Sequence, residues 1–159
     1  MTTWFTSDLH INHVNILQYC RSEFFDSLEE MNEMIVENHN SVVAPLDHVI
    51  VFGDVVMGKR AEGLPLIERM NGRKTLILGN HDYPHPCNPE KIVNKWTDIY
   101  QDFFISMHTG LKIDLGFIHA WGSHFPAVMQ DHTDEVRYAE FRPVAEYESG
   151  MPIIHGHLH

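Results

Sequence analysis

The segment Lys74-Thr75-Leu76-Ile77-Leu78-Gly79-Asn80-His81-Asp82 passes from an apolar strand directly into a polar turn. Residues 74–78 have the length and composition of a buried strand, and Gly79 permits a sharp turn at its end. Amide, imidazole and carboxylate side chains then follow one another. In layered α/β folds, ligands bind at the carboxyl ends of strands, where loops converge. The segment therefore predicts a strand that delivers Asn80, His81 and Asp82 to a site.

Four other predicted strands end in side chains of the same kind. Asp8 and His10 are two positions apart on a segment that we expect to be extended, so they can project the same way and share one cation. Glycines stand directly before Asp54 and His157, as before Asn80, and we expect them to serve as turn points. The four strand ends are Ser7-Asp8-Leu9-His10, Gly53-Asp54, Ser123-His124-Phe125-Pro126 and His155-Gly156-His157-Leu158-His159.

These motifs differ in specificity. Asp-x-His is as often a capping carboxylate beside a surface histidine as it is a ligand pair, and Gly-Asp alone is a common turn. Gly-Asn-His-Asp and Gly-His-Leu-His are much rarer outside functional sites. Their occurrence in this order, each after a strand, is the strong signal.

Strands and helices alternate along the chain, which predicts an α/β layered fold. Ser27-Leu28-Glu29-Glu30 is a capping-box pattern at the start of a helix, and Asn88-Pro89-Glu90 opens another. The stretch from Tyr100 to Ser123 is β-rich, with a turn expected near Thr109-Gly110. A two-sheet β-sandwich flanked by helices accommodates both halves. We expect one domain over residues 1–159. The predicted strands are 3–7, 47–52, 74–78 and 151–154, and a helix is also predicted over 62–70.

The composition favours a metal-binding protein. The 159 residues include 13 histidines and have a formal net charge of −11. Clustered Lys and Arg are what a protein needs to follow a nucleic-acid backbone, and the acidic balance argues against such a groove. Carboxylates with imidazoles suit Mn, Fe, Zn, Co or Ni. No segment has the ~20 apolar residues of a membrane helix, and the N-terminus has no signal-peptide pattern, so we expect a cytoplasmic protein.

The ordered motifs resemble those of the calcineurin-like metallophosphoesterases. The resemblance extends from Asp8 to His159, and Phe5-Thr6-Ser7-Asp8-Leu9-His10 with the following His13 is similar to the compact phage and bacterial members. A phage origin would place the protein in the host cytoplasm. The resemblance implies a β-sandwich flanked by helices and two divalent metal ions, with Mn favoured over Fe, Zn, Ni or Co. It also implies a metal-bound hydroxide as the nucleophile.

The resemblance also implies a role for each residue of the motifs. Asp8, His10 and His159 would bind the first metal, and Asp54 would bridge the two. Asn80, His124 and His157 would bind the second metal, and Asn80 would also contact the substrate. His81 would act at the leaving oxygen as a general acid or charge stabiliser, oriented by Asp82.

Several assignments stay open in the sequence. His119 competes with His124 as a ligand; we prefer His124 because the following aromatic residue and proline would terminate the strand. His13 is the preferred additional substrate contact, although a surface histidine explains it equally well. Further candidates for substrate contact are Arg21, Arg73 and His85, and Arg21 could instead form a structural ion pair.

Two features depart from the family pattern. Relatives often place an acidic residue three positions after the bridging aspartate, where this chain has Met57. The sequence also ends at His159, whereas relatives usually continue into further strands. We therefore expect the chain to lack C-terminal strands, which leaves the first metal with a mobile terminal ligand.

The expected function is hydrolysis of a small phosphodiester, a nucleotide or a related ester, by a binuclear metal centre. A metal-dependent nuclease shares this chemistry, but no basic groove is evident. A non-catalytic scaffold of the same fold and a hydrolase of amides or other esters are the remaining alternatives. Native metal, substrate and oligomeric state are left open by the sequence.

Overall fold

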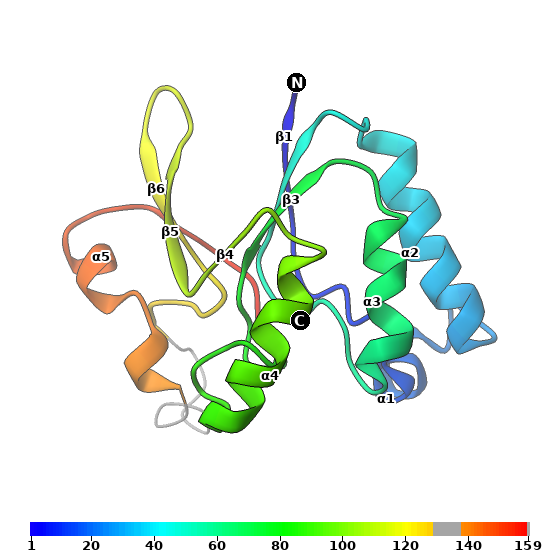
Figure 1. Cartoon of the computed structure of the whole chain (residues 1–159). Helices are drawn as coiled ribbons and strands as arrows, with labels where there is room; N and C mark the ends of the chain where they lie inside the picture. Colours follow the sequence, from blue (N-terminus) through cyan, green and yellow to red (C-terminus); the bar gives the residue numbers. More distant parts are fainter. Residues whose placement is uncertain (129–137, 159) are drawn as a thin grey trace.

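The computed structural model describes residues 1–128 and 138–158. Four parallel strands form the first sheet in the order β1-β2-β3-β4 (Figure 1). Their bounds are Thr3–Thr6, His48–Val51, Arg73–Ile77 and Ser106–His108. Thr6, Val51 and Leu76 lie in one row across β1, β2 and β3. The three strands therefore end nearly level, and the loops that follow them emerge at one edge of the sheet.

The second sheet has three strands, in the order β5-β6-β7. Their bounds are Gly110–Asp114, His119–Ser123 and Ile153–His155; β5 and β6 are antiparallel, and β7 is parallel to β6. The turn expected near Thr109-Gly110 corresponds to a bend at Thr109. Thr109 connects β4 of the first sheet to β5 of the second. The hairpin turn lies at residues 115–118, where Gly116 has a φ of 83°.

Alternate residues of the central strands face two different cores. On β2, Val49 and Val51 belong to the core that the helices cover, together with Leu64 and Ile67 of α3 (Arg60–Glu68). Ile50 points the other way and packs with Phe52, Ile77 and Ile113 between the two sheets. Strands that are buried on both faces read as continuous apolar runs, which explains the composition of residues 49–52 and 76–78. This arrangement is the predicted α/β fold, with two sheets and flanking helices.

The helices begin near the predicted points. In α2 (Leu28–Val42), the Ser27 side chain accepts a hydrogen bond from the Glu30 amide at 3.0 Å, as a capping box requires. Pro89 directly precedes α4 (Glu90–Gln101), and α3 starts two residues earlier than expected. Helices α2 and α3 lie side by side along one face of the first sheet (Figure 1). The elements not predicted are α1, η1, η2 and α5, at Val14–Ile16, Leu17–Arg21, Ala139–Phe141 and Val144–Glu148.

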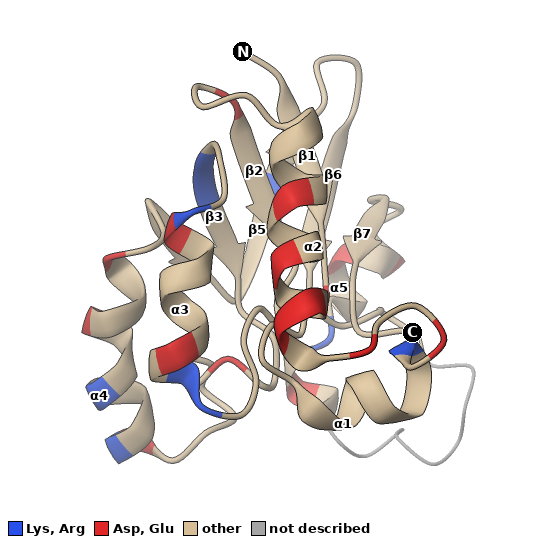
Figure 2. Ribbon diagram, turned by 90° about the vertical axis from the view of Figure 1, so that its right-hand side faces the viewer, with Lys and Arg blue, Asp and Glu red and all other residues tan. Residues whose placement is uncertain are grey.

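Acidic residues recur along α2, where Glu29 and Glu37 are exposed (Figure 2). Basic residues are scattered over several elements in the same view, without a continuous stripe. Within residues 1–128 and 138–158, every helix is too short or too polar to cross a membrane.

Candidate metal centre

Residues from both sheets meet at the carboxyl edge of β1, β2 and β3. Asp8 and His10 follow β1, Asp54 follows β2, and Asn80 follows β3. His124 and His157 come from the loops after β6 and β7 of the second sheet. Six of the seven expected ligands therefore lie on loops that leave one end of the sandwich. The seventh, His159, lies outside the described residues.

The backbone at four of these residues is unusual. Asp8, His10, Asp54 and His157 have φ values of 52°, 50°, 54° and 71°, in the left-handed region that non-glycine residues seldom occupy. The expectation that Asp8 and His10 share an extended segment is therefore wrong. Their amides instead donate to the Gly53 and Asp54 carbonyls, at 3.1 and 3.0 Å, which folds the first loop onto the second. Such strain persists where surrounding contacts hold it, and it is concentrated at functional sites.

The three glycines that precede ligands act for two different reasons. Gly53 has a φ of 82°, as expected for a turn glycine. Gly79 and Gly156 do not depend on a positive φ; they allow close approach. A Cβ on Gly79 would overlap Asp54 Oδ1, and one on Gly156 would overlap the Ser7 hydroxyl. Neither space admits a side chain, because the loops are packed directly against each other.

The first group of donor atoms that could hold a metal comprises Asp8, His10 and Asp54. Asp8 Oδ1 lies 3.9 Å from His10 Nε2, and the His10 ring is buried. The other ring nitrogen, Nδ1, is 3.2 Å from Nδ1 of His13. His13 thus holds the ring of a candidate ligand, as outer partners of metal-binding histidines commonly do.

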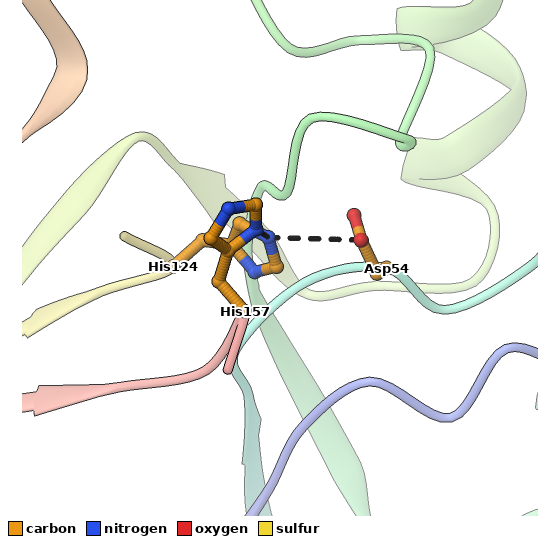
Figure 3. Close-up of side chains that lie close together, drawn as sticks. All are labelled: Asp54, His124 and His157. Atoms are coloured by element: carbon orange, nitrogen blue, oxygen red, sulfur yellow. Dashed lines mark hydrogen bonds and ion pairs between the residues drawn. The ribbon is translucent and has the colours of Figure 1, made fainter. Parts of the chain in front are cut away.

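The second group comprises Asp54, His124 and His157 (Figure 3). His124 is fully buried, and its Nδ1 is 2.7 Å from the Phe52 carbonyl oxygen. A carbonyl only accepts, so Nδ1 carries the hydrogen, and Nε2 of the neutral ring presents a lone pair. Nε2 lies 3.1 Å from Asn80 Oδ1, 3.1 Å from His157 Nδ1 and 3.6 Å from Asp54 Oδ2.

This convergence of donor atoms fits a cation. With Asp54 ionised and the His124 ring neutral, Asn80 Oδ1, Asp54 Oδ2 and His124 Nε2 bring lone pairs together without a proton between them. Such a set is unfavourable when empty and favourable around a positive ion. Oxygen and imidazole donors without thiolate suit the borderline divalent ions.

Asp54 belongs to both groups and is 2% exposed. Burial, with a smaller contribution from the neighbouring Asp8 charge, raises the pKa of its carboxyl group to about 7. Its two oxygens have different neighbours: Oδ1 accepts a hydrogen bond from the His81 amide at 3.0 Å, and Oδ2 faces the imidazoles of His124 and His81. A carboxylate shared in this way can serve two cations.

His81 and Asp82 play different parts. The His81 ring is 43% exposed, and its Nε2 lies 4.0 Å from Asp54 Oδ2, at the open side of the site. Asp82 is fully buried and accepts from the backbone amides of Gly79, Asp54 and Val55 at 2.8, 2.9 and 3.1 Å. Through these three contacts Asp82 joins the loop after β2 to the loop after β3, which presents His81; its expected role in orienting His81 stays a prediction.

The other candidate substrate contacts are placed mostly in structural roles. Arg21 donates to the Leu9 and Asp8 carbonyls at 3.1 and 3.3 Å, so it supports the first loop. Arg73 begins β3, at the opposite end of the strand from Asn80. His85 is 1% exposed, and burial lowers its pKa to about 4, so it is a neutral core residue. Neither Arg73 nor His85 is placed to contact a substrate at this site.

His119 and His124 lie in separate environments. His119 is on β6, with its side chain 55% exposed and its Nδ1 3.7 Å from Asp114 Oδ1. The structure places His124, not His119, with the donor groups. This agrees with the preference drawn from the sequence.

Three supporting residues were missed from the sequence. The Ser7 hydroxyl hydrogen-bonds Asp8 Oδ2 and the Phe52 carbonyl. Asn32 of α2 accepts from the Asn12 amide at 2.9 Å. Arg60 donates to the His81 carbonyl at 2.8 Å. Ser7 lies inside the first motif and could have been singled out there, whereas Asn32 and Arg60 look like ordinary helix residues.

Comparison with known proteins agrees with this geometry. A family model described as calcineurin-like phosphoesterase matches residues 1–159. The Gene 66 proteins of Mycobacterium phages L5 and D29 are 35% and 32% identical, over 99% and 98% of this chain and 77% of each relative. A crystal structure of a protein of unknown function from Aquifex aeolicus superposes with a TM-score of 0.73 at 25% identity, covering 99% of this chain and 78% of that one. Asp/His donor groups, left-handed ligand loops and a two-sheet fold thus occur in a chain that belongs to the calcineurin-like phosphoesterase family.

Proposed function

We propose that this protein is a binuclear metal-dependent phosphodiesterase that hydrolyses a small phosphate ester, such as a nucleotide derivative. The observation that carries the proposal is that two groups of metal donors share Asp54. A shared carboxylate holds two cations ~3.5–4 Å apart, the separation used for in-line displacement at phosphorus. Mn²⁺ is the metal we expect, with Fe, Zn, Ni and Co as alternatives.

Each of the two ions would be held by its own set of side chains. Asp8, His10 and Asp54 would hold one ion, and Asp54, Asn80, His124 and His157 would hold the other, with residue 159 as a further ligand of the first. When bound, the two ions lower the pKa of water toward ~7 and stabilise negative charge on the transferred phosphoryl group. The four positive charges exceed the two of Asp8 and Asp54, so the site attracts a phosphate although the protein is acidic.

His81 is the proposed general acid. Its ring is the exposed imidazole at the open side of the site, 4.0 Å from Asp54 Oδ2. In this position it can donate a proton to the departing oxygen of the ester. Proton donation of this kind typically contributes ~10²–10⁴-fold to a rate.

A small substrate fits the surroundings better than a nucleic-acid strand. A pocket of about 530 Å³ opens beside Asp8, and Arg21, Phe24 and Phe25 are among the residues that line it. Its size and mixed apolar lining suit an organic group of a small ester. The acidic residues along α2 oppose the approach of a polyanion (Figure 2).

The test uses metal-stripped protein with Mn²⁺ added back, and compares a bis-aryl phosphodiester with the matching aryl monoester. We expect Mn²⁺-dependent turnover, faster with the diester. Asp54→Asn keeps the shape of the side chain but removes its charge, and we expect it to lose several kcal/mol of transition-state stabilisation, about 10³-fold or more in rate.

Asp98→Asn, at an exposed position of α4, is the matched control and should retain full activity. A folded protein that hydrolyses neither ester with any of the five metals would contradict the proposal and favour a non-catalytic scaffold. Faster cleavage of oligonucleotides than of the small diester would favour the nuclease.

A further inference from the structure

Arg60 is a buried cation beside the candidate site. It is the first residue of α3 and is 8% exposed. Among the described residues, no carboxylate forms an ion pair with it, and its Nε has no hydrogen-bond partner. Removing a charged group from water costs several kcal/mol unless the surroundings compensate. The environment of Arg60 therefore does not explain it as a simple structural ion pair.

Two hydrogen bonds of Arg60 are directed at the backbone of two loops. Nη2 donates to the His81 carbonyl at 2.8 Å, and Nη1 donates to the Gly58 carbonyl at 3.2 Å. The guanidinium carbon lies 3.5 Å from the centre of the Tyr83 ring, so the guanidinium group makes a cation–π contact with that ring. One side chain thus joins the loop after β2 to the loop that presents His81.

The backbone of His81 is fixed on both sides as a result. Its amide donates to Asp54 Oδ1 at 3.0 Å, and its carbonyl accepts from Arg60. With both flanking peptide groups held, the direction of the Cα–Cβ bond is set, and the position of the ring then depends on the side-chain torsions of His81. The imidazole is 43% exposed, and its Nε2 lies 4.0 Å from Asp54 Oδ2.

We propose that Arg60 is a positioning residue for His81, holding the His81 peptide so that the imidazole stays over the donor atoms of Asp54. The inference rests on the proposed function, in which His81 donates a proton to the leaving group. Arginine suits this task better than lysine. Its planar fork reaches two carbonyl groups and stacks on Tyr83 at once, whereas an ammonium is a point charge that would satisfy one of them.

The first experiment measures kcat for aryl phosphodiesters whose leaving phenols span a range of pKa, with Mn²⁺-loaded protein. The variants are Arg60→Met, Arg60→Lys, His81→Ala and Arg60→Met with His81→Ala. We expect Arg60→Met to lower kcat about 10- to 100-fold for the poorest leaving groups and hardly at all for the best, because only poor leaving groups need the proton. Arg60→Lys should recover part of the loss, and the KM and bound Mn²⁺ should stay unchanged.

The double variant separates positioning from general support of the fold. If Arg60 acts through His81, the double variant is no slower than His81→Ala alone. Equal losses across all leaving groups, or losses that multiply in the double variant, would overturn the inference. Arg69→Met, an exposed arginine paired with Glu33, is the control and should match the wild type.

A second measurement does not depend on turnover. Amide hydrogen exchange of the His81 N–H, followed in metal-free protein, reports the bond to Asp54 Oδ1. We expect exchange to be about tenfold faster or more in Arg60→Met, with Arg60→Lys between it and the wild type. Unchanged exchange in a folded variant would overturn the inference. A wild type that is inert toward every ester would contradict the proposed function, and the exchange result would still decide the part that Arg60 plays.

Discussion

The two groups of donor atoms that share Asp54 are held in place by different means. In the second group, His124 is fully buried and is fixed by a 2.7 Å hydrogen bond to the Phe52 carbonyl. In the first group, His10 is fixed through another imidazole, that of His13, at 3.2 Å. Backbone carbonyls hold a ring in one tautomer, whereas a histidine partner can donate or accept. The second group is therefore the better preorganised of the two, and we expect it to bind its ion more tightly.

The largest expected effect comes from removing one ligand from either group. His124→Gln should abolish binding at the tighter site, and His10→Gln should abolish binding at the weaker one. Both should lower kcat/KM by about 10³-fold or more, because each variant loses one of the two cations that stabilise the transition state. Mn²⁺ titration of each variant by calorimetry separates the two losses. If His10→Gln removes the tighter site, the second group is not the one that binds its ion more tightly.

The next effect concerns His81, whose Nε2 lies 4.0 Å from Asp54 Oδ2 but which belongs to neither donor group. His81→Ala should lower kcat by about 10²–10⁴-fold for poor leaving groups while both ions stay bound. Kinetics combined with metal analysis of the same sample checks both parts. Loss of bound metal from this variant would mean that His81 is a ligand.

A smaller effect should mark the weaker support of the first group. His13→Phe removes the contact to His10 Nδ1 and should weaken that site by about 10- to 100-fold, as changes to outer partners of metal ligands do. The second site should keep its affinity. Calorimetric titration resolves the two steps. Weakening of both sites alike would show that His13 supports the whole centre.

The smallest effect is a pH dependence in the metal-free protein. Burial raises the pKa of Asp54 in the folded state, so the folded protein holds more protons there than the unfolded chain does. Stability from this group is present below the pKa of the unfolded chain, near 4, and is lost as the pH rises through about 7. The metal-free Asp54→Asn variant lacks this loss. Its free energy of unfolding should therefore decline less steeply with pH than that of the wild type, and the two slopes should differ by up to about 1.4 kcal/mol per pH unit.

Denaturant unfolding of wild type and Asp54→Asn between pH 5 and pH 8 measures that difference together with the change at Asp82, whose pKa is raised by burial and by the Asp54 charge. Added Mn²⁺ should remove the wild-type decline, because the ion replaces the proton. Identical pH profiles for the two metal-free proteins would contradict the raised pKa.

The sequence contained most of the information about which strands lead to the site. The apolar run before Gly79 and the capping box at Ser27 are local patterns, and both correspond to elements that begin or end within about two residues of the predicted points. The burial of residues inside a helix is harder to predict. Met34 follows the helical spacing of apolar residues in α2 but is 37% exposed, because the buried stripe of that helix is narrower than the spacing suggests.

The conformations and supports of the site could not be predicted from local pattern. The left-handed backbone of Asp8 and His10 is imposed by hydrogen bonds to residues 53 and 54, more than forty positions away. Arg60 stands in a Gly-Lys-Arg stretch that resembles an exposed helix start, and only tertiary packing buries it. Asp82 was recognised as a site residue, but its three backbone partners become visible only when the two loops are brought together.

The central claim is that one carboxylate, Asp54, serves two metal ions. The most direct measurement is the number of Mn²⁺ ions bound per chain by wild type, His10→Gln, His124→Gln and Asp54→Asn, determined by calorimetric titration of metal-stripped protein. The predicted stoichiometries are two for the wild type, one for each histidine variant, and none of comparable affinity for Asp54→Asn. A wild type that binds a single ion, or an Asp54→Asn variant that still binds two tightly, would contradict the account.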